Sequence, residues 1–136
     1  MLSYNIDIGE NSKWLITTPN DNAKNLPFYI YEIGHFICNK DYYTERKGQK
    51  NFFLMFTVSG CGYLKYKEKE YLLPANTAAL IYCDNYQFYK TYSVEPWDYR
   101  WLHFNGKSSK TYMNIINEDA LNVITITEPM EFEQIH

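Results

Sequence analysis

Short apolar segments separated by polar turns follow one another along most of the chain. Within them, apolar and polar residues often alternate with the period of two that is typical of half-buried strands. Turn residues recur about every 8–12 positions, which predicts a β-sandwich or barrel rather than a parallel α/β sheet. The expected strands are Leu26–Cys38, Phe52–Val58, Tyr63–Tyr66, Glu70–Leu73, Ala78–Cys83, Gln87–Ser93, Trp97–Phe104 and Asn122–Thr127.

Turn residues between these strands have definite roles. The charged segment Lys67-Glu68-Lys69 is expected to close a hairpin. Asn76 ends the next turn, where a left-handed backbone is expected because Asn tolerates it better than most residues. Gly60 and Gly62 permit a bend or bulge where the sheet turns a corner. By contrast, the polar segment Asn39–Asn51 is expected to be a loop.

The two ends of the chain differ from its middle. Residues 1–25 are polar apart from Trp14–Ile16, and they predict an N-terminal arm with at most one strand. Residues 26–106 are expected to form the barrel. Residues 107–136 predict a helix over Ser108–Asn117, a strand, and a second helix beginning at Pro129. The apolar face of the first helix is expected to consist of Tyr112, Ile115 and Ile116.

Composition and charge narrow the class of protein. Aromatic residues make up 18% of the chain, with 14 Tyr, and Tyr favours pleated strands. The formal net charge is −3 and no basic stripe is present, so this segment is not expected to hold DNA by itself. The first residues lack the apolar core of a signal peptide, and no run approaches the roughly 20 apolar residues of a membrane helix. A cytoplasmic protein is expected, with Cys38, Cys61 and Cys83 as buried free thiols.

Motifs for metal binding or nucleophilic catalysis are missing from the sequence. The only histidines, His35, His103 and His136, are scattered and form no His-x-His pair. Neither a Cys-x-x-Cys pair nor a Gly-x-Ser-x-Gly elbow occurs. We therefore expect no metal, no cofactor and no enzymatic activity.

Two motifs point to a known family. Ser59-Gly60-Cys61-Gly62 ends the central strand, and Trp97-Asp98-Tyr99-Arg100-Trp101-Leu102-His103-Phe104-Asn105-Gly106 closes the barrel. With the order of elements between them, they make the chain resemble the N-terminal, cupin-like effector-binding domain of AraC-family transcription regulators. Two positions depart from the family pattern. Asn76 stands where glycine is frequent, and the Pro-x-x-x-His of many relatives is absent, leaving Gln87 as a polar position of uncertain role.

The resemblance implies a mainly β, cupin-like jelly-roll barrel followed by a short helical segment. It also implies a small polar effector, for which the aromatic content favours a carbohydrate. DNA would be bound only by a helix-turn-helix domain beyond His136, and a homodimer is possible. In some relatives the N-terminal arm folds over the effector, and the segment Thr17–Pro19 is a candidate for such a lid.

Five residues are candidates for ligand binding. Strand alternation places Tyr99, Trp101 and His103 on one face of the closing strand, and the resemblance directs this face into the barrel. Arg46 lies near the position of a family arginine at the pocket mouth, although an exposed loop arginine is favoured slightly. Tyr89 lies on the preceding strand.

Two alternatives to a sensing domain remain open at this stage. The aromatic side chains could simply fill the barrel, leaving a domain that only dimerises. The chain could also be a small cupin enzyme that acts on a sugar, although the missing His-x-His pair argues against it.

Overall fold

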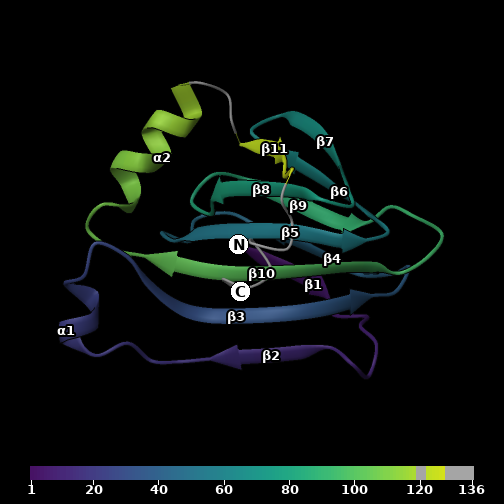
Figure 1. Cartoon of the computed structure of the whole chain (residues 1–136), viewed down its shortest axis with the longest axis horizontal. Helices are drawn as coiled ribbons and strands as arrows, with labels where there is room; N and C mark the ends of the chain where they lie inside the picture. The colour runs from purple at the N-terminus through teal and green to yellow at the C-terminus, as the bar shows by residue number, and fades with distance from the viewer. Residues whose placement is uncertain (119–121, 128–136) are drawn as a thin grey trace.

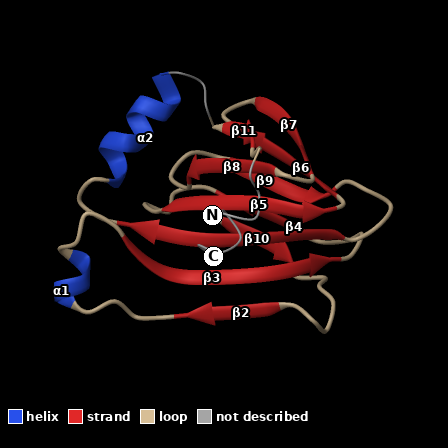
Figure 2. Ribbon diagram, in the orientation of Figure 1, coloured by secondary structure: helices blue, strands red, loops and turns tan. Residues whose placement is uncertain are grey.

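The computed structural model of the chain describes residues 1–118 and 122–127. Two antiparallel sheets lie face to face, and two short helices flank one end of the strands (Figures 1 and 2). The five-stranded sheet has the order β1 (Leu2–Asn5), β4 (Tyr43–Arg46), β9 (Gln87–Thr91), β6 (Cys61–Tyr66) and β7 (Lys69–Pro74). The six-stranded sheet has the order β11 (Val123–Thr125), β8 (Thr77–Tyr82), β5 (Phe52–Ser59), β10 (Trp97–Asn105), β3 (Tyr29–Cys38) and β2 (Lys13–Ile16). The helices are α1 (Asp21–Lys24) and α2 (Ser109–Glu118).

The arrangement confirms the predicted mainly β, cupin-like barrel with a short helical segment. Strand β10 lies between β5 and β3 in the six-stranded sheet. The residues that alternation assigned to its inner face, Trp97, Tyr99, Trp101 and His103, are all buried. The first three of these side chains belong to one hydrophobic core with inward-facing residues of the five-stranded sheet such as Leu64 and Tyr89.

The N-terminal residues are more structured than expected, because they contribute two strands rather than at most one. Strand β1 pairs with β4 at the edge of the five-stranded sheet, and β2 pairs with β3 at the edge of the six-stranded sheet. The candidate lid segment begins with Thr17, whose backbone N–H donates to the Tyr31 carbonyl at 2.7 Å. Thr17 thus extends the pairing of β2 with β3.

The expectation of a loop over Asn39–Asn51 is wrong for its central part. Strand β4 occupies Tyr43–Arg46 and pairs with both β1 and β9. Its inward-facing residues, Thr44 and Arg46, are polar and yet buried. The sequence therefore lacks the apolar alternation by which a strand is usually recognised.

The turns follow the sequence closely. Asn76 has φ +66°, the left-handed backbone expected there. The charged hairpin is tighter than predicted, because Lys69 already belongs to β7 and only Lys67 and Glu68 form the turn, both with positive φ. Gly60 has φ +71°. Gly62 serves another purpose, since a Cβ there would lie 2.3 Å from the Trp97 indole.

The helical region was predicted in position but not in orientation. Helix α2 matches the predicted segment, but the buried apolar residue in its described part is Met113, while Tyr112 and Ile115 are exposed. The helix predicted from Pro129 lies outside the described residues. None of the helices in residues 1–118 and 122–127 is long and apolar enough to cross a membrane.

The cysteines are free, as predicted, but they are not all buried. Cys38 and Cys83 lie in the core, whereas Cys61 is partly exposed. Burial raises the pKa of the Cys83 thiol to about 11, so this thiol stays protonated at neutral pH.

Candidate ligand-binding cavity

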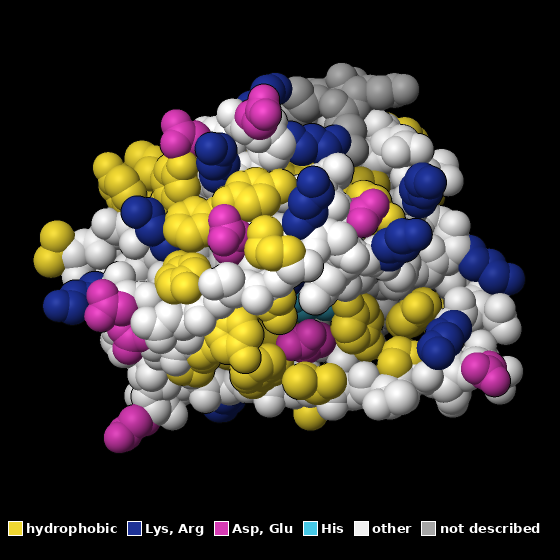
Figure 3. Space-filling model, turned by 180° about the vertical axis from the view of Figure 1, so that it is seen from behind, with side chains coloured by type: hydrophobic (Ala, Val, Ile, Leu, Met, Phe, Trp, Pro, Cys, Tyr) yellow, Lys and Arg dark blue, Asp and Glu magenta, His cyan; other side chains and the backbone are white. Residues whose placement is uncertain are grey.

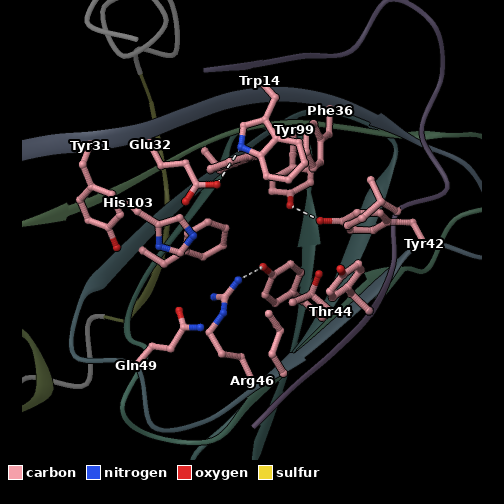
Figure 4. A pocket seen from close by; sticks show the side chains of 16 residues that line it. Trp14, Tyr31, Glu32, Phe36, Tyr42, Thr44, Arg46, Gln49, Tyr99 and His103 are labelled. Atoms are coloured by element: carbon pink, nitrogen blue, oxygen red, sulfur yellow. Dashed lines mark hydrogen bonds between the residues drawn. The ribbon is translucent and has the colours of Figure 1, made fainter. Parts of the chain in front are cut away.

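A cavity of about 420 Å³ lies between the two sheets (Figure 4). This volume is within the range of small-molecule sites, so side chains do not fill the barrel. The edge strands β1 and β2 both contribute to the lining, with Leu2, Tyr4 and Trp14 half exposed. Hydrophobic side chains gather on the molecular face seen in Figure 3. The full lining consists of Leu2, Tyr4, Ile6, Trp14, Tyr31, Glu32, Phe36, Tyr42, Thr44, Arg46, Gln49, Phe53, Tyr89, Tyr99, Trp101 and His103.

Strand β10 forms one wall of the cavity with Tyr99, Trp101 and His103. The first residue of the same row, Trp97, lies outside the lining. Its indole stacks on the Tyr99 ring with centroids 4.0 Å apart and donates from Nε1 to Thr57 Oγ1 at 3.0 Å. Tyr99 thus marks the inner end of the cavity.

The polar groups on this wall are neutral. Tyr99 and Tyr42 share a hydrogen bond of 2.6 Å between their hydroxyls, and burial raises the pKa of both phenols. Burial, followed by the nearby Arg46 charge, lowers the pKa of His103 to about 3. The neutral His103 ring lies with Nδ1 3.0 Å from Asn51 Oδ1. If Asn51 Oδ1 is the acceptor, Nδ1 carries the proton and Nε2 is left as an acceptor.

Arg46 enters the cavity from the opposite sheet and is only 8% exposed, so the expectation of an exposed loop arginine is wrong. Its guanidinium donates from Nη1 to Gln87 Oε1 at 3.3 Å and Cys83 Sγ at 3.5 Å, and from Nη2 to Tyr89 Oη at 3.2 Å. Its carbon Cζ also lies 5.5 Å from the centroid of the Phe53 ring. All of these partners are neutral. Within the described residues, the buried Nε–H has no acceptor.

Gln87, to which the sequence assigned no definite role, forms hydrogen bonds with Arg46 from outside the cavity lining. The side chain is completely buried and does not line the cavity. Besides accepting from the Arg46 guanidinium, its Nε2 donates to the Arg46 carbonyl at 2.9 Å. Gln87 therefore fixes both the backbone and the side chain of Arg46.

A β-bulge in β3 adds two further residues to the lining. Glu32 is opposite His103, whereas the next residue of β10, Phe104, is opposite Ile30, so Tyr31 is the extra residue. Both Tyr31 and Glu32 therefore reach the cavity, as bulges near binding sites often allow. The Tyr31 ring stacks on His103 with centroids 6.0 Å apart.

Trp14 connects the N-terminal residues to the site. Its Nε1–H donates to Glu32 Oε2 at 2.7 Å (Figure 4). Its ring lies edge-on to those of Phe36 and Trp101. Strand β2 thereby places an indole at the cavity while its own backbone extends the six-stranded sheet.

All five residues predicted from the sequence, Arg46, Tyr89, Tyr99, Trp101 and His103, line this one cavity. Their contact with a ligand stays a prediction. The other eleven lining residues were not predicted, and they are Leu2, Tyr4, Ile6, Trp14, Tyr31, Glu32, Phe36, Tyr42, Thr44, Gln49 and Phe53. Of these, Glu32 could have been predicted from the sequence, because strand alternation places it on the same face as the apolar residues Phe36 and Cys38. Among the described residues, no group of three or more His, Cys, Asp or Glu side chains is arranged to hold a metal ion.

Fold and cavity together define a cupin-like ligand-binding barrel. The family model of the AraC-like ligand binding domain matches residues 29–130. The chain belongs to this family, which confirms the resemblance carried by the glycine turn and the closing strand. The match makes this a domain for sensing a small-molecule effector.

Solved structures support the same fold at low sequence identity. The plu4264 protein from Photorhabdus luminescens superposes with a TM-score of 0.55 at 11% identity, covering 86% of this chain and 91% of its own. The cupin domain of an XRE-family transcriptional regulator from Enterobacter cloacae superposes with a TM-score of 0.52 at 16% identity, covering 69% of this chain and 96% of its own. YhaK from Escherichia coli superposes with a TM-score of 0.58 at 10% identity, covering 74% of this chain and 47% of its own. No curated protein matches the chain in sequence.

Proposed function

We propose that this domain binds a small carbohydrate in the cavity between its sheets and regulates transcription as the sensing part of an AraC-type regulator. The observation that carries the proposal is the convergence of an indole face with hydroxyl, imidazole and guanidinium groups in one cavity of about 420 Å³. In the proposed full-length cytoplasmic protein, DNA is bound by a separate helix-turn-helix domain, and the regulator acts as a homodimer.

The chemistry of the lining suits a sugar. An indole offers a flat apolar surface for the C–H face of a pyranose ring, and two indoles, those of Trp101 and Trp14, line the cavity. The Tyr42 and Tyr99 hydroxyls and the His103 ring supply both donors and acceptors for sugar hydroxyls. A cavity with apolar walls and a few placed polar groups is typical of small-molecule sites.

The proposed role is regulatory rather than enzymatic. Regulation requires that the ligand prefer one of two states of the protein. Trp14 provides such a connection, because it touches the cavity and belongs to the N-terminal strand β2. A ligand packed against Trp14 would stabilise this strand on the barrel, and the position of the N-terminal residues would then differ between the bound and free states.

The proposal is tested by a thermal-shift screen against neutral pentoses, hexoses and sugar acids. A ligand that binds only the folded state adds roughly 2.7 kcal/mol of stability at a hundredfold excess over Kd. We expect at least one class of sugar to raise the Tm of the wild type, with a smaller rise in Trp101→Phe. Trp97→Phe is the matched control, since Trp97 lies on the same strand and outside the lining. It should lower the basal Tm and retain the ligand-induced rise. Failure of all these compounds to raise the Tm would contradict the proposed function.

A further inference from the structure

Arg46 forms no direct ion pair within the described part of the chain. The side chain is 8% exposed, and its three hydrogen-bond acceptors are a thiol, an amide oxygen and a phenol at 3.2–3.5 Å. Charge-assisted bonds to an anion are normally shorter, at about 2.7–2.9 Å. In residues 1–118 and 122–127, the only side chains within salt-bridge distance of each other are His35 and Asp98, on another part of the barrel. Arg46 is therefore a buried cation held by neutral groups, with its Nε–H unpaired in that same part of the chain.

A buried charge without a direct ionic partner is costly, so the cavity favours an anionic group that can bond to Arg46 itself. The guanidinium is planar and matches the two oxygens of a carboxylate. Gln87 fixes its orientation, as described above. The neighbouring His103 cannot provide an alternative positive charge, because burial lowers its pKa to about 3.

The cavity also holds one negative charge, on the other wall. Glu32 comes from β3 in the six-stranded sheet, whereas Arg46 comes from β4 in the five-stranded sheet, and both side chains point into the cavity (Figure 4). One Glu32 oxygen accepts from Trp14 Nε1 at 2.7 Å. The carboxylate can accept further hydrogen bonds from hydroxyl or amino groups, and it repels a second anion.

We infer that the ligand is a sugar acid with a single carboxylate, which Arg46 binds, and with hydroxyl groups directed toward Glu32. This inference rests on the proposed function and narrows it from carbohydrates in general to monoacids. Glu32 then acts as a specificity residue that rejects diacids.

The test compares matched sugars by calorimetric titration: glucose and galactose, their uronic acids, and the corresponding hexaric diacids. The wild type is expected to bind a uronate at least tenfold more tightly than the parent hexose, and to bind the diacid more weakly than the uronate. Arg46→Met should weaken uronate binding by about 10- to 100-fold and hexose binding much less, so that the preference for the uronate over the hexose is lost. Arg46→Lys keeps the positive charge but loses the planar guanidinium that can bind both carboxylate oxygens. Its affinity for the uronate should lie between those of the wild type and Arg46→Met.

Glu32→Gln is expected to bind the diacid more tightly than the wild type does, and misfolding of the variant could not produce such an increase. The amide oxygen can still accept from Trp14, while removal of the charge should tighten diacid binding by about tenfold. Equal binding of hexose and uronate, both insensitive to Arg46→Met, would overturn the inference and leave the proposed function standing. An unchanged diacid affinity in Glu32→Gln would overturn the role of Glu32. If none of the sugars binds, the proposed function fails and this inference fails with it.

Discussion

Gly34 on β3 lies directly against the indole of Trp101 on β10. The two residues are register partners, and a Cβ on Gly34 would lie 2.3 Å from Trp101 Cε2. Gly62 on β6, in the other sheet, makes an equally close contact with Trp97, since a Cβ there would lie 2.3 Å from Trp97 Cε2. Both tryptophans of the closing strand thus pack directly against a glycine. Trp101 does so at the cavity and Trp97 in the core.

The glycine pair gives a matched test of the cavity wall. We expect Gly34→Ala to push the Trp101 indole toward the cavity and to abolish the ligand-induced rise in Tm. Gly62→Ala should displace Trp97 instead and leave ligand binding largely intact. Each substitution should lower the free energy of unfolding by about 1–3 kcal/mol, because both overpack a tight contact. Equal loss of binding in the two variants, measured by thermal shift, would show that the effect is general destabilisation.

Protonation of His103 should make the fold sensitive to acid. The pKa of His103 is lowered from its ordinary value of 6.5 to about 3 in the folded state, chiefly by burial. Between these pH values the unfolded chain binds more protons, so the free energy of unfolding decreases as the pH falls from about 6.5 toward 3. Chemical denaturation at a series of pH values should show this loss, with a shallower slope in His103→Gln. The control is His35→Gln, and equal slopes in the wild type and His103→Gln would contradict the prediction.

The hairpin between β6 and β7 offers room for stabilisation. Lys67 and Glu68 both have positive φ, at +50° and +67°, in a two-residue turn for which Asn-Gly is preferred. Left-handed backbone costs non-glycine residues roughly 1–2 kcal/mol. The double variant K67N/E68G should therefore raise the free energy of unfolding by about 1 kcal/mol, as measured by urea denaturation. A decrease would mean that the exposed side chains contribute more than the backbone conformation does.

Ligand binding should protect strand β2 from proteolysis. Trp14 lines the cavity and bonds to Glu32, while Lys13 beside it is an exposed trypsin site. Cleavage after Lys13 should slow when a sugar that raises the Tm is added. Cleavage after the exposed Lys67, in the remote hairpin, should not change. Equal rates of cleavage after Lys13 with and without ligand would show that ligand binding does not stabilise the N-terminal strand β2.

The sequence predicted the closing strand and its inner face because period-two alternation is strong there. It failed at β4, where the inward positions are Thr44 and Arg46. A strand that directs polar side chains into a cavity lacks apolar alternation, so the inward position of Arg46 also concealed the strand that carries it.

The bulge at Tyr31 marks a second limit. Alternation assigns Tyr31 and Glu32 to opposite faces, yet both line the cavity because β3 has an extra residue opposite β10. That extra residue depends on pairing between strands far apart in the chain. Trp14 was missed for a related reason, since its place at the cavity depends on the pairing of β2 with β3.

The three tryptophans allow the most direct test of a ligand in the cavity. Trp14 and Trp101 line it, whereas Trp97 is buried behind Tyr99. Each indole N–H gives its own signal in a two-dimensional proton–nitrogen NMR spectrum. Titration with a sugar that raises the Tm should shift the Trp14 and Trp101 signals and leave the Trp97 signal nearly in place. Stationary Trp14 and Trp101 signals at saturation would mean that the ligand binds elsewhere, and would contradict the assignment of this cavity as the sensing site.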